Sequence, residues 1–239
     1  MTKITVLGDR NEAYVTHRAL DAALGQLPEG VTAQWHPTDV PLGDLGDGLW
    51  VAPGSPYADD EAVLEAIGRA RREGVPLLGT CGGFQYTVLS LAGAGMDAHA
   101  EATPDAPAPV IAPIACRVDG EERTVTPVVG TRLAALLGDA PFPGTFFCGY
   151  APRAVVGATV SAHAQDVGPC ALEGPGGDAP FLMATLFQPQ MGALRGEPLS
   201  PVIAAFAEAA IQHAYTTNND QSSATERYRS ASPSPTAAA

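Results

Sequence analysis

The stretch Gly79-Thr80-Cys81-Gly82-Gly83-Phe84-Gln85 follows directly on the apolar run Val75-Pro76-Leu77-Leu78. This order predicts a short buried strand, a sharp turn and then a helix. The glycines around Cys81 permit a backbone conformation that other residues rarely adopt, and they leave the thiol raised at the start of the helix. The pattern therefore predicts a cysteine nucleophile elbow, although an inert buried cysteine in an α/β turn would also fit it.

A cysteine at a helix start has two advantages as a nucleophile. The positive end of the helix dipole is expected to lower the pKa of the Cys81 thiol. The free backbone N–H groups of the first helical turn, that of Gly82 first, can also hold the oxyanion of a tetrahedral intermediate.

Composition limits the class of protein that carries this elbow. The chain has 239 residues, of which 46% are hydrophobic, as expected for one α/β domain with a sizeable core. Its formal net charge is −13, and its longest basic cluster is only Arg69 with Arg71 and Arg72. Nucleic acid is therefore not expected as a partner, and a small-molecule substrate fits better.

Signals for a membrane, a cofactor or a metal are missing from the sequence. Residues 1–7 lead straight into a strand with no secretory leader, and no apolar run approaches the roughly 18 residues of a membrane span. The sequence has no phosphate-binding Gly-Lys-Ser/Thr loop, dinucleotide fingerprint or metal-ligand cluster, and its cysteines show no C-x-x-C spacing. We expect a cytoplasmic protein with no membrane association, no cofactor and no metal.

Apolar runs alternate with helical patterns along residues 1–215, which is typical of a mainly parallel sheet with helices on both faces. The predicted strands are 4–8, 31–36, 49–53, 75–80, 145–149, 155–163, 169–173 and 181–187, and the predicted helices are 12–24, 59–73, 131–137 and 201–215, with another after the elbow. Residues 110–118 and 123–129 are predicted to form an antiparallel pair around a turn at Asp119-Gly120. Residues 216–239 are rich in Ser, Thr, Asn, Pro and Ala, so we expect a disordered low-complexity tail.

Several segments in this order resemble the class I glutamine amidotransferase-like family, most closely the stand-alone proteins related to the C-terminal domain of CTP synthase. The similar segments are Ala52-Pro53-Gly54-Ser55-Pro56-Tyr57, the elbow, Cys148-Gly149-Tyr150 and Phe187-Gln188-Pro189-Gln190. The resemblance covers residues 1 to about 214. It implies a single flavodoxin-like α/β domain with a mostly parallel sheet.

The resemblance also implies a chemistry for the elbow. In amidotransferases the elbow cysteine attacks the side-chain amide of glutamine, ammonia leaves, and a glutamyl thioester is hydrolysed. By this analogy the turn at Pro53-Gly54 supplies a second oxyanion N–H beside that of Gly82. Ser55 and Gln85 then fall near the substrate.

One departure from the family matters for the mechanism. Class I amidotransferases carry His-x-Glu near the C-terminus, whereas this chain has Gln188-Pro189-Gln190. A neutral amide cannot accept a proton at neutral pH, so the usual Cys-His-Glu triad is missing and ordinary glutaminase activity is not expected. Gln188 and Gln190 can still hydrogen-bond a ligand or the thiol, or only nearby backbone.

A replacement base must come from elsewhere in the chain. His17 lies on the apolar stripe of the first predicted helix, where a hydrogen-bonded core histidine is the alternative. His99 and Glu101 follow the elbow helix and are the second candidate, with an exposed loop pair as the alternative. Cys148 and Tyr150 come from a segment that the resemblance places beside the substrate, although Cys148 also fits a buried strand position, as do Cys116 and Cys170.

Two classes of function remain open. The first is an enzyme in which Cys81 forms a thioester-type adduct with an amide, an ester or an activated carbonyl. The second is a catalytically inactive amidotransferase-like protein that binds a metabolite or a synthetase partner. Ammonia released at Cys81 would have to pass to a separate synthetase or biosynthetic enzyme, because no second catalytic domain is present. A homodimer remains compatible with the sequence.

Overall fold

The computed structural model describes residues 1–177 and 179–231, apart from the side chains of residue 116 and of residues 220–231. In chain order the elements are β1 (Thr2–Leu7), α1 (Val15–Leu24), β2 (Val31–His36), β3 (Gly48–Val51), α2 (Asp60–Glu73), β4 (Leu77–Thr80), α3 (Gly82–Ala92), the 3-10 helix η1 (Met96–Ala98), β5 (Ile111–Pro127), α4 (Arg132–Leu137), β6 (Phe142–Pro152), β7 (Thr159–Ala164), β8 (Gly168–Glu173), β9 (Leu182–Thr185), the 3-10 helix η2 (Pro189–Arg195) and α5 (Pro201–Ala231). The predicted Cys116 core position falls on a side chain outside this description.

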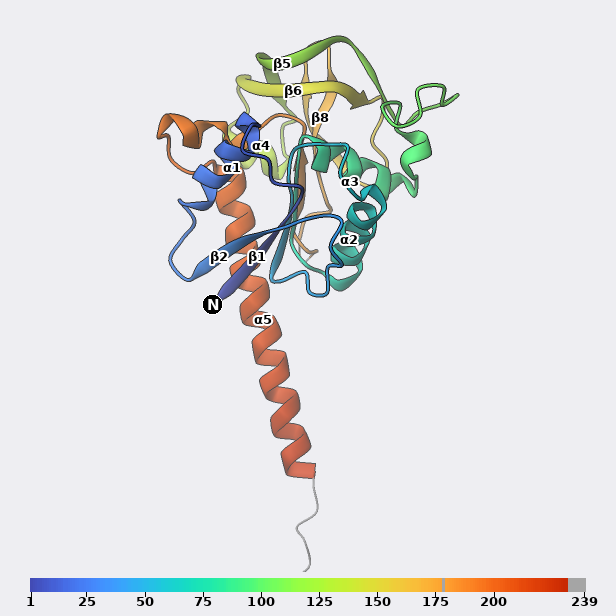
Figure 1. Cartoon of the computed structure of the whole chain (residues 1–239). Helices are drawn as coiled ribbons and strands as arrows, with labels where there is room; N and C mark the ends of the chain where they lie inside the picture. Colours follow the sequence, from blue (N-terminus) through green and yellow to red (C-terminus); the bar gives the residue numbers. More distant parts are fainter. Residues whose placement is uncertain (178, 232–239) are drawn as a thin grey trace, which may run out of the picture.

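The strands of the described residues form one nine-stranded sheet in the order β2-β1-β3-β4-β9-β8-β7-β5-β6. From β2 to β9 the neighbouring strands are parallel, and from β9 to β6 they are antiparallel. Helices α2 and α3 pack together on one face of the parallel strands, and α5 crosses the other face (Figure 1). This confirms the predicted α/β fold with helices on both faces, and it adds a long antiparallel extension to the parallel part.

The helix before the elbow shows how local sequence sets the boundaries. The Asp59 side chain accepts a hydrogen bond from the Ala62 N–H and caps α2, while Gly74 ends the helix in a left-handed conformation with φ 75°. Its buried positions recur at helical spacing, namely Val63, Ala66, Ile67 and Ala70. Strand β4 follows at once, with all four residues buried. The elbow therefore starts from the middle of the sheet.

The glycines of the elbow let α3 lie directly against β3. A Cβ atom on Gly83 would come within 2.3 Å of the Val51 carbonyl oxygen, and one on Gly79 within 2.6 Å of the Gly83 carbonyl oxygen. Both neighbours are backbone atoms, which cannot move aside as a side chain can. Glycine is required here for close approach, because any side chain would push the helix off the sheet.

The predicted antiparallel pair between 110–118 and 123–129 is wrong. Both segments belong to the single strand β5, which pairs with β6 along most of its length. Gly120 has φ 76°, and the register shifts between Asp119 and Glu121, so the Asp-Gly pair forms a bulge rather than a turn. Figure 1 shows β5 and β6 curving together over the carboxyl ends of the parallel strands.

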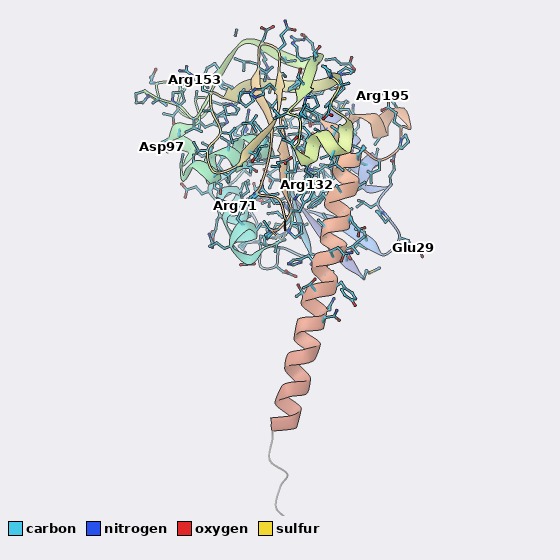
Figure 2. The ribbon with its side chains drawn as sticks, turned by 180° about the vertical axis from the view of Figure 1, so that it is seen from behind. Glu29, Arg71, Asp97, Arg132, Arg153 and Arg195 are labelled. Carbon is cyan, nitrogen blue, oxygen red and sulfur yellow. The ribbon has the colours of Figure 1, made fainter. Side chains whose placement is uncertain are left out.

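The last helix is longer than predicted. Its first half is buried, with Val202, Ile203 and Phe206 against the sheet, and the Phe206 ring packs edge-on to Trp50. Beyond Tyr215, where a disordered tail was predicted, α5 continues to Ala231 and extends away from the body of the molecule (Figures 1 and 2). No Pro or Gly interrupts residues 216–231, so nothing in the backbone ends the helix there. The rest of the predicted tail, residues 232–239, lies outside the described residues.

No helix in the described part of the chain combines the length and the apolar composition needed to cross a bilayer.

Replacing Gly83 by alanine tests the packing of the elbow. The added Cβ meets the Val51 carbonyl oxygen, so we expect Gly83→Ala to lower the free energy of unfolding by about 3 kcal/mol, the upper end of the usual range for overpacking. Urea denaturation followed by circular dichroism measures this change. Gly43→Ala is the matched control, because a Cβ on Gly43 meets no atom within 4 Å, and it should shift stability far less. Equal effects of the two substitutions would contradict the packing described here.

Candidate active site

Cys81 sits at the turn between β4 and α3 in a strained conformation, with φ 53° and ψ −108°. A positive φ is rare for a residue with a side chain, and it marks a position that the surrounding structure holds in place. Here the Cys81 N–H donates to the Thr185 carbonyl oxygen of β9 at 2.8 Å, which ties the elbow to the neighbouring strand. The predicted nucleophile-elbow geometry is thus present.

The Cys81 side chain is 8% exposed and has defined partners on both sides. Its thiol donates to the Phe147 carbonyl oxygen at 3.4 Å. The Gln188 amide and the Gly82 N–H act on the sulfur as hydrogen-bond donors, which lowers the thiol pKa. The Gln188 approach is looser than an ordinary hydrogen bond, since its amide nitrogen has no partner of standard geometry among the described residues.

The predicted low pKa of the Cys81 thiol is wrong. Burial raises this pKa to about 11, and the donors Gln188 and Gly82 only partly offset the cost of desolvating a thiolate. The negative charge of Glu101 raises it further. The resting group at neutral pH is therefore a protonated thiol.

The turn after β3 meets the elbow where the sequence placed the oxyanion hole. A Cβ on Gly82 would lie 2.9 Å from the Ser55 nitrogen, so the two backbones are in direct contact. Gly54, with φ 110°, lies beside this contact and lines the same cleft as Cys81. The backbone of the turn after β3 and that of the first residue of α3 therefore meet beside Cys81.

His17 fixes this turn instead of reaching the thiol. Its Nε2–H donates to the Pro53 carbonyl oxygen at 2.8 Å, and its Nδ1 accepts from the Asn11 N–H at 2.9 Å. Burial lowers the pKa of His17, which favours the neutral ring that this pattern requires. With both ring nitrogens engaged, His17 holds Pro53-Gly54 in place and has no free nitrogen to take a proton from Cys81.

His99 is held in a second network that forms a wall of the cleft. Its Nδ1 accepts from the Glu101 N–H, and its Nε2 lies 3.3 Å from the Gln85 side-chain oxygen. The Gln85 amide nitrogen in turn donates to the Tyr150 carbonyl oxygen at 2.8 Å. Burial lowers the pKa of His99 to about 4. The structure thus links Gln85, His99 and Tyr150 to one another, and none of the three hydrogen-bonds Cys81 among the described residues.

Gln188 and Gln190, at the sequence positions where the family carries His-x-Glu, are linked to each other near Cys81. Both side chains are buried, with 3% and 1% exposed. The Gln190 amide nitrogen donates to the Gln188 side-chain oxygen at 2.7 Å, so the amide nitrogen is the polar atom of Gln188 that stays without a standard partner among the described residues. The amide oxygen of Gln190 has no hydrogen-bond partner among the described residues.

Cys81 opens into a cleft with a volume of about 370 Å³. Its lining includes seven of the residues named from the sequence, namely Pro53, Gly54, Ser55, Gln85, Glu101, Cys148 and Tyr150. It also includes four residues that were not named, namely Tyr14, Arg117, Asp119 and Phe147. Arg117 and Asp119 are alternate residues of one strand and so share a face, which is the signal that could have found them once 110–127 had been taken as continuous.

Two charged side chains of the cleft differ in how far they are exposed to solvent. Glu101 is half-buried, and burial raises its pKa while the Arg117 guanidinium opposes that rise. Arg117 is exposed and takes part in no salt bridge within the described residues. A ligand bound over Cys81 therefore meets a carboxylate and a free guanidinium.

Two further cysteines have described side chains. Cys148 and Cys170 are buried free thiols, and burial raises the pKa of each. No three His, Cys, Asp or Glu side chains are arranged to hold a metal ion in the parts of the chain described above.

Comparison with solved structures decides the fold family. The glutaminase domain of a Trypanosoma brucei CTP synthase, solved with bound acivicin, superposes with a TM-score of 0.71 at 16% identity, covering 89% of this chain and 94% of that one. The chain has the class I glutamine amidotransferase-like fold. A putative GMP synthase subunit from Thermoplasma acidophilum gives a TM-score of 0.60 at 18% identity over 91% and 98% of the two chains.

Two further comparisons bear on this amidotransferase-like chain. A CTP synthase from Mycolicibacterium gilvum is 30% identical over 170 residues, 66% of this chain, and the chain spans about a quarter of that relative, 26% of its length. A glutamine amidotransferase from Thermotoga maritima gives a TM-score of 0.58 at 10% identity over 88% and 84% of the two chains. No family model matches the sequence.

The raised thiol pKa predicts the pH dependence of Cys81 alkylation. Because the thiolate is the nucleophile and the pKa is about 11, the alkylation rate should rise about tenfold per pH unit from neutral pH to about pH 10. Iodoacetamide labelling followed by peptide mass spectrometry measures it, with Cys81→Ala giving the background from the other thiols. A rate that levels off near pH 7 would show that the thiol pKa is low instead.

The hydrogen bonds of His17 predict a positioning role that can be separated from that of a base. His17→Ala leaves the Asn11 N–H and the Pro53 carbonyl without partners, so we expect a loss of about 1–3 kcal/mol in stability. A loosened turn should also slow chloroketone labelling of Cys81 about tenfold, with the pH profile unchanged. His163→Ala, at an exposed strand position, is the control and should do neither. A changed pH profile in His17→Ala would instead assign His17 the proton.

Proposed function

We propose that the protein is an atypical cysteine-dependent enzyme in which Cys81 forms a covalent thioester-type adduct with a small amide, ester or activated carbonyl compound. The observation that carries the proposal is the strained elbow itself. Cys81 is held at φ 53° and opens into a cleft, whereas a binding protein has no need of a nucleophile in a strained conformation.

The surroundings of the thiol support acyl chemistry in particular. Backbone segments at Gly54-Ser55 and at Gly82 meet beside Cys81, and such N–H groups stabilise the oxyanion of a tetrahedral intermediate. His17 keeps the first of these segments in place through the Pro53 carbonyl. The site thus supplies stabilisation of the intermediate without supplying a base.

The charges of the cleft suit a small substrate with charged groups of its own. The Glu101 carboxylate suits a substrate ammonium group, and the free guanidinium of Arg117 suits a carboxylate. Gln85, Tyr150 and Cys148 line the same cleft. Ordinary glutaminase activity is not part of the proposal, because Gln188 and Gln190 cannot take the place of a proton-transferring imidazole.

The second candidate is a catalytically inactive amidotransferase-like protein that binds a metabolite or a synthetase partner. The raised pKa of the Cys81 thiol favours it, since a protonated thiol is a poor nucleophile. One similar structure is described as a GMP synthase subunit, which makes a separate synthetase a reasonable partner for this chain.

Active-site labelling separates the two candidates. A glutamine-like diazoketone or chloroketone should label the protein saturably at Cys81 alone, as read by intact mass and peptide mapping, and Cys81→Ala should abolish the label. Cys148→Ala should leave labelling of Cys81 in place. Slow labelling spread over several cysteines would favour the binding protein.

The role of Arg117 can be tested in the same assay. Arg117→Gln removes the guanidinium at the cleft, so the concentration of chloroketone that gives half-maximal labelling should rise about tenfold, the loss of one charge-assisted hydrogen bond. Arg153→Gln is the matched control, because Arg153 is exposed, lies outside the cleft lining and projects at the periphery of the molecule (Figure 2). Equal shifts in the two variants would show only a general effect of charge.

A further inference from the structure

The groups that contact the Cys81 sulfur can hold its proton or donate to it, but none can carry the proton away. The thiol donates to the Phe147 carbonyl, which is too weakly basic to be protonated. Gln188 is near enough to the sulfur for its amide to lower the thiol pKa as a hydrogen-bond donor. Gln190 occupies the Gln188 oxygen by donating to it at 2.7 Å, and the buried Gln188 nitrogen has no other partner of standard geometry among the described residues.

The ionisable groups nearby are also unable to accept the proton directly. His17 and His99 each use Nδ1 to accept a backbone N–H, and their Nε2 atoms face Pro53 and Gln85. Glu101 acts on Cys81 through its charge and forms no hydrogen bond with the thiol. None of these groups can therefore act as the base that accepts the Cys81 proton, and the Gln188 amide cannot act as that base either.

This arrangement limits which acyl compounds can react. An amine leaves a tetrahedral intermediate only after it gains a proton, and no group at the sulfur supplies one. A thiolate leaves without protonation. The intermediate formed from a thioester can therefore expel the external thiolate, which leaves the acyl group on Cys81.

We propose that the site takes small acyl thioesters, and that Gln188 sets this specificity by presenting an amide N–H where an amide substrate would need a proton-transferring group. The inference rests on the proposed function, because it presupposes an acyl adduct on Cys81. It narrows the substrate class from carbonyl compounds in general to those with a thiolate leaving group.

The two steps balance without any further reactant than water. In the first, the bond from Cys81 Sγ to the acyl carbon forms, the bond from that carbon to the external sulfur breaks, and the proton lost by Cys81 passes through solvent to the released thiolate. In the second, water adds to the acyl carbon, the Sγ–carbon bond breaks, and a carboxylic acid and the Cys81 thiol result.

A matched pair of substrates tests the inference in the unmodified protein. Both carry a γ-glutamyl group, one as the thioester of N-acetylcysteamine and the other as the amide, glutamine. We expect the thioester to acylate Cys81 and to be hydrolysed at least a hundredfold faster than by Cys81→Ala. We expect the amide to react no faster than with that variant. Intact mass and product release measure the two steps.

Substitutions at position 188 then test whether the Gln188 side chain is what prevents hydrolysis of the amide substrate. Gln188→His places an imidazole beside the sulfur and should raise amide hydrolysis about a hundredfold, the lower end of the range for general acid–base catalysis, while changing thioester hydrolysis less than tenfold. Gln188→Ala removes the amide without adding a base and should give no gain with glutamine.

The outcomes separate this inference from the proposed function. Equal rates with thioester and amide in the unmodified protein would overturn the thioester assignment and leave the covalent enzyme standing. Saturable chloroketone labelling of Cys81 together with no acylation by the thioester would have the same meaning. If the folded protein gives no adduct with either substrate or with the chloroketone, the proposed function itself fails.

Discussion

The close contact of α3 with β3 is the constraint on which the rest of the site depends. Gly83 rests on the Val51 carbonyl and Gly79 lies under Gly83, so α3 begins directly after Cys81, and that residue has a positive φ of 53°. The thiol is thereby aimed into the cleft, and the first turn of α3 meets the Ser55 backbone. Phe147 and Gln188 then complete the surroundings of a sulfur whose position the backbone has already determined.

The elbow and the order of the elements could be predicted because their causes are local. Glycines at fixed offsets, an apolar run before them and capping residues such as Asp59 lie within a few residues of the structure that they determine. The strand β5 was mistaken for a hairpin because Asp119-Gly120 has the composition of a turn, whereas its partner β6 lies farther along the chain. Composition likewise suggested disorder after residue 215, although no helix-breaking residue occurs before Pro233.

The sequence indicated which residues lie near Cys81 better than it indicated what each of them contacts. His17 was placed on the buried face of its helix, but its acceptor, the Pro53 carbonyl, lies 36 residues away. The low pKa expected for Cys81 followed from the helix start alone, and the burial of the sulfur outweighs it. A helix terminus is visible in a sequence, whereas the desolvation of one sulfur depends on the whole fold.

Cys81 and two charged residues of the cleft come from different halves of the sheet. Cys81 belongs to the parallel half, where strain and close packing leave little freedom to change. Arg117 and Asp119 belong to β5 in the antiparallel extension, next to a bulge that already tolerates an irregular register. Under the proposed function, substitutions at these two positions of β5 can therefore change the charge of the molecule that is accepted while Cys81 stays as it is. In this architecture, the reacting residue and the charges that surround the accepted molecule can evolve at different rates.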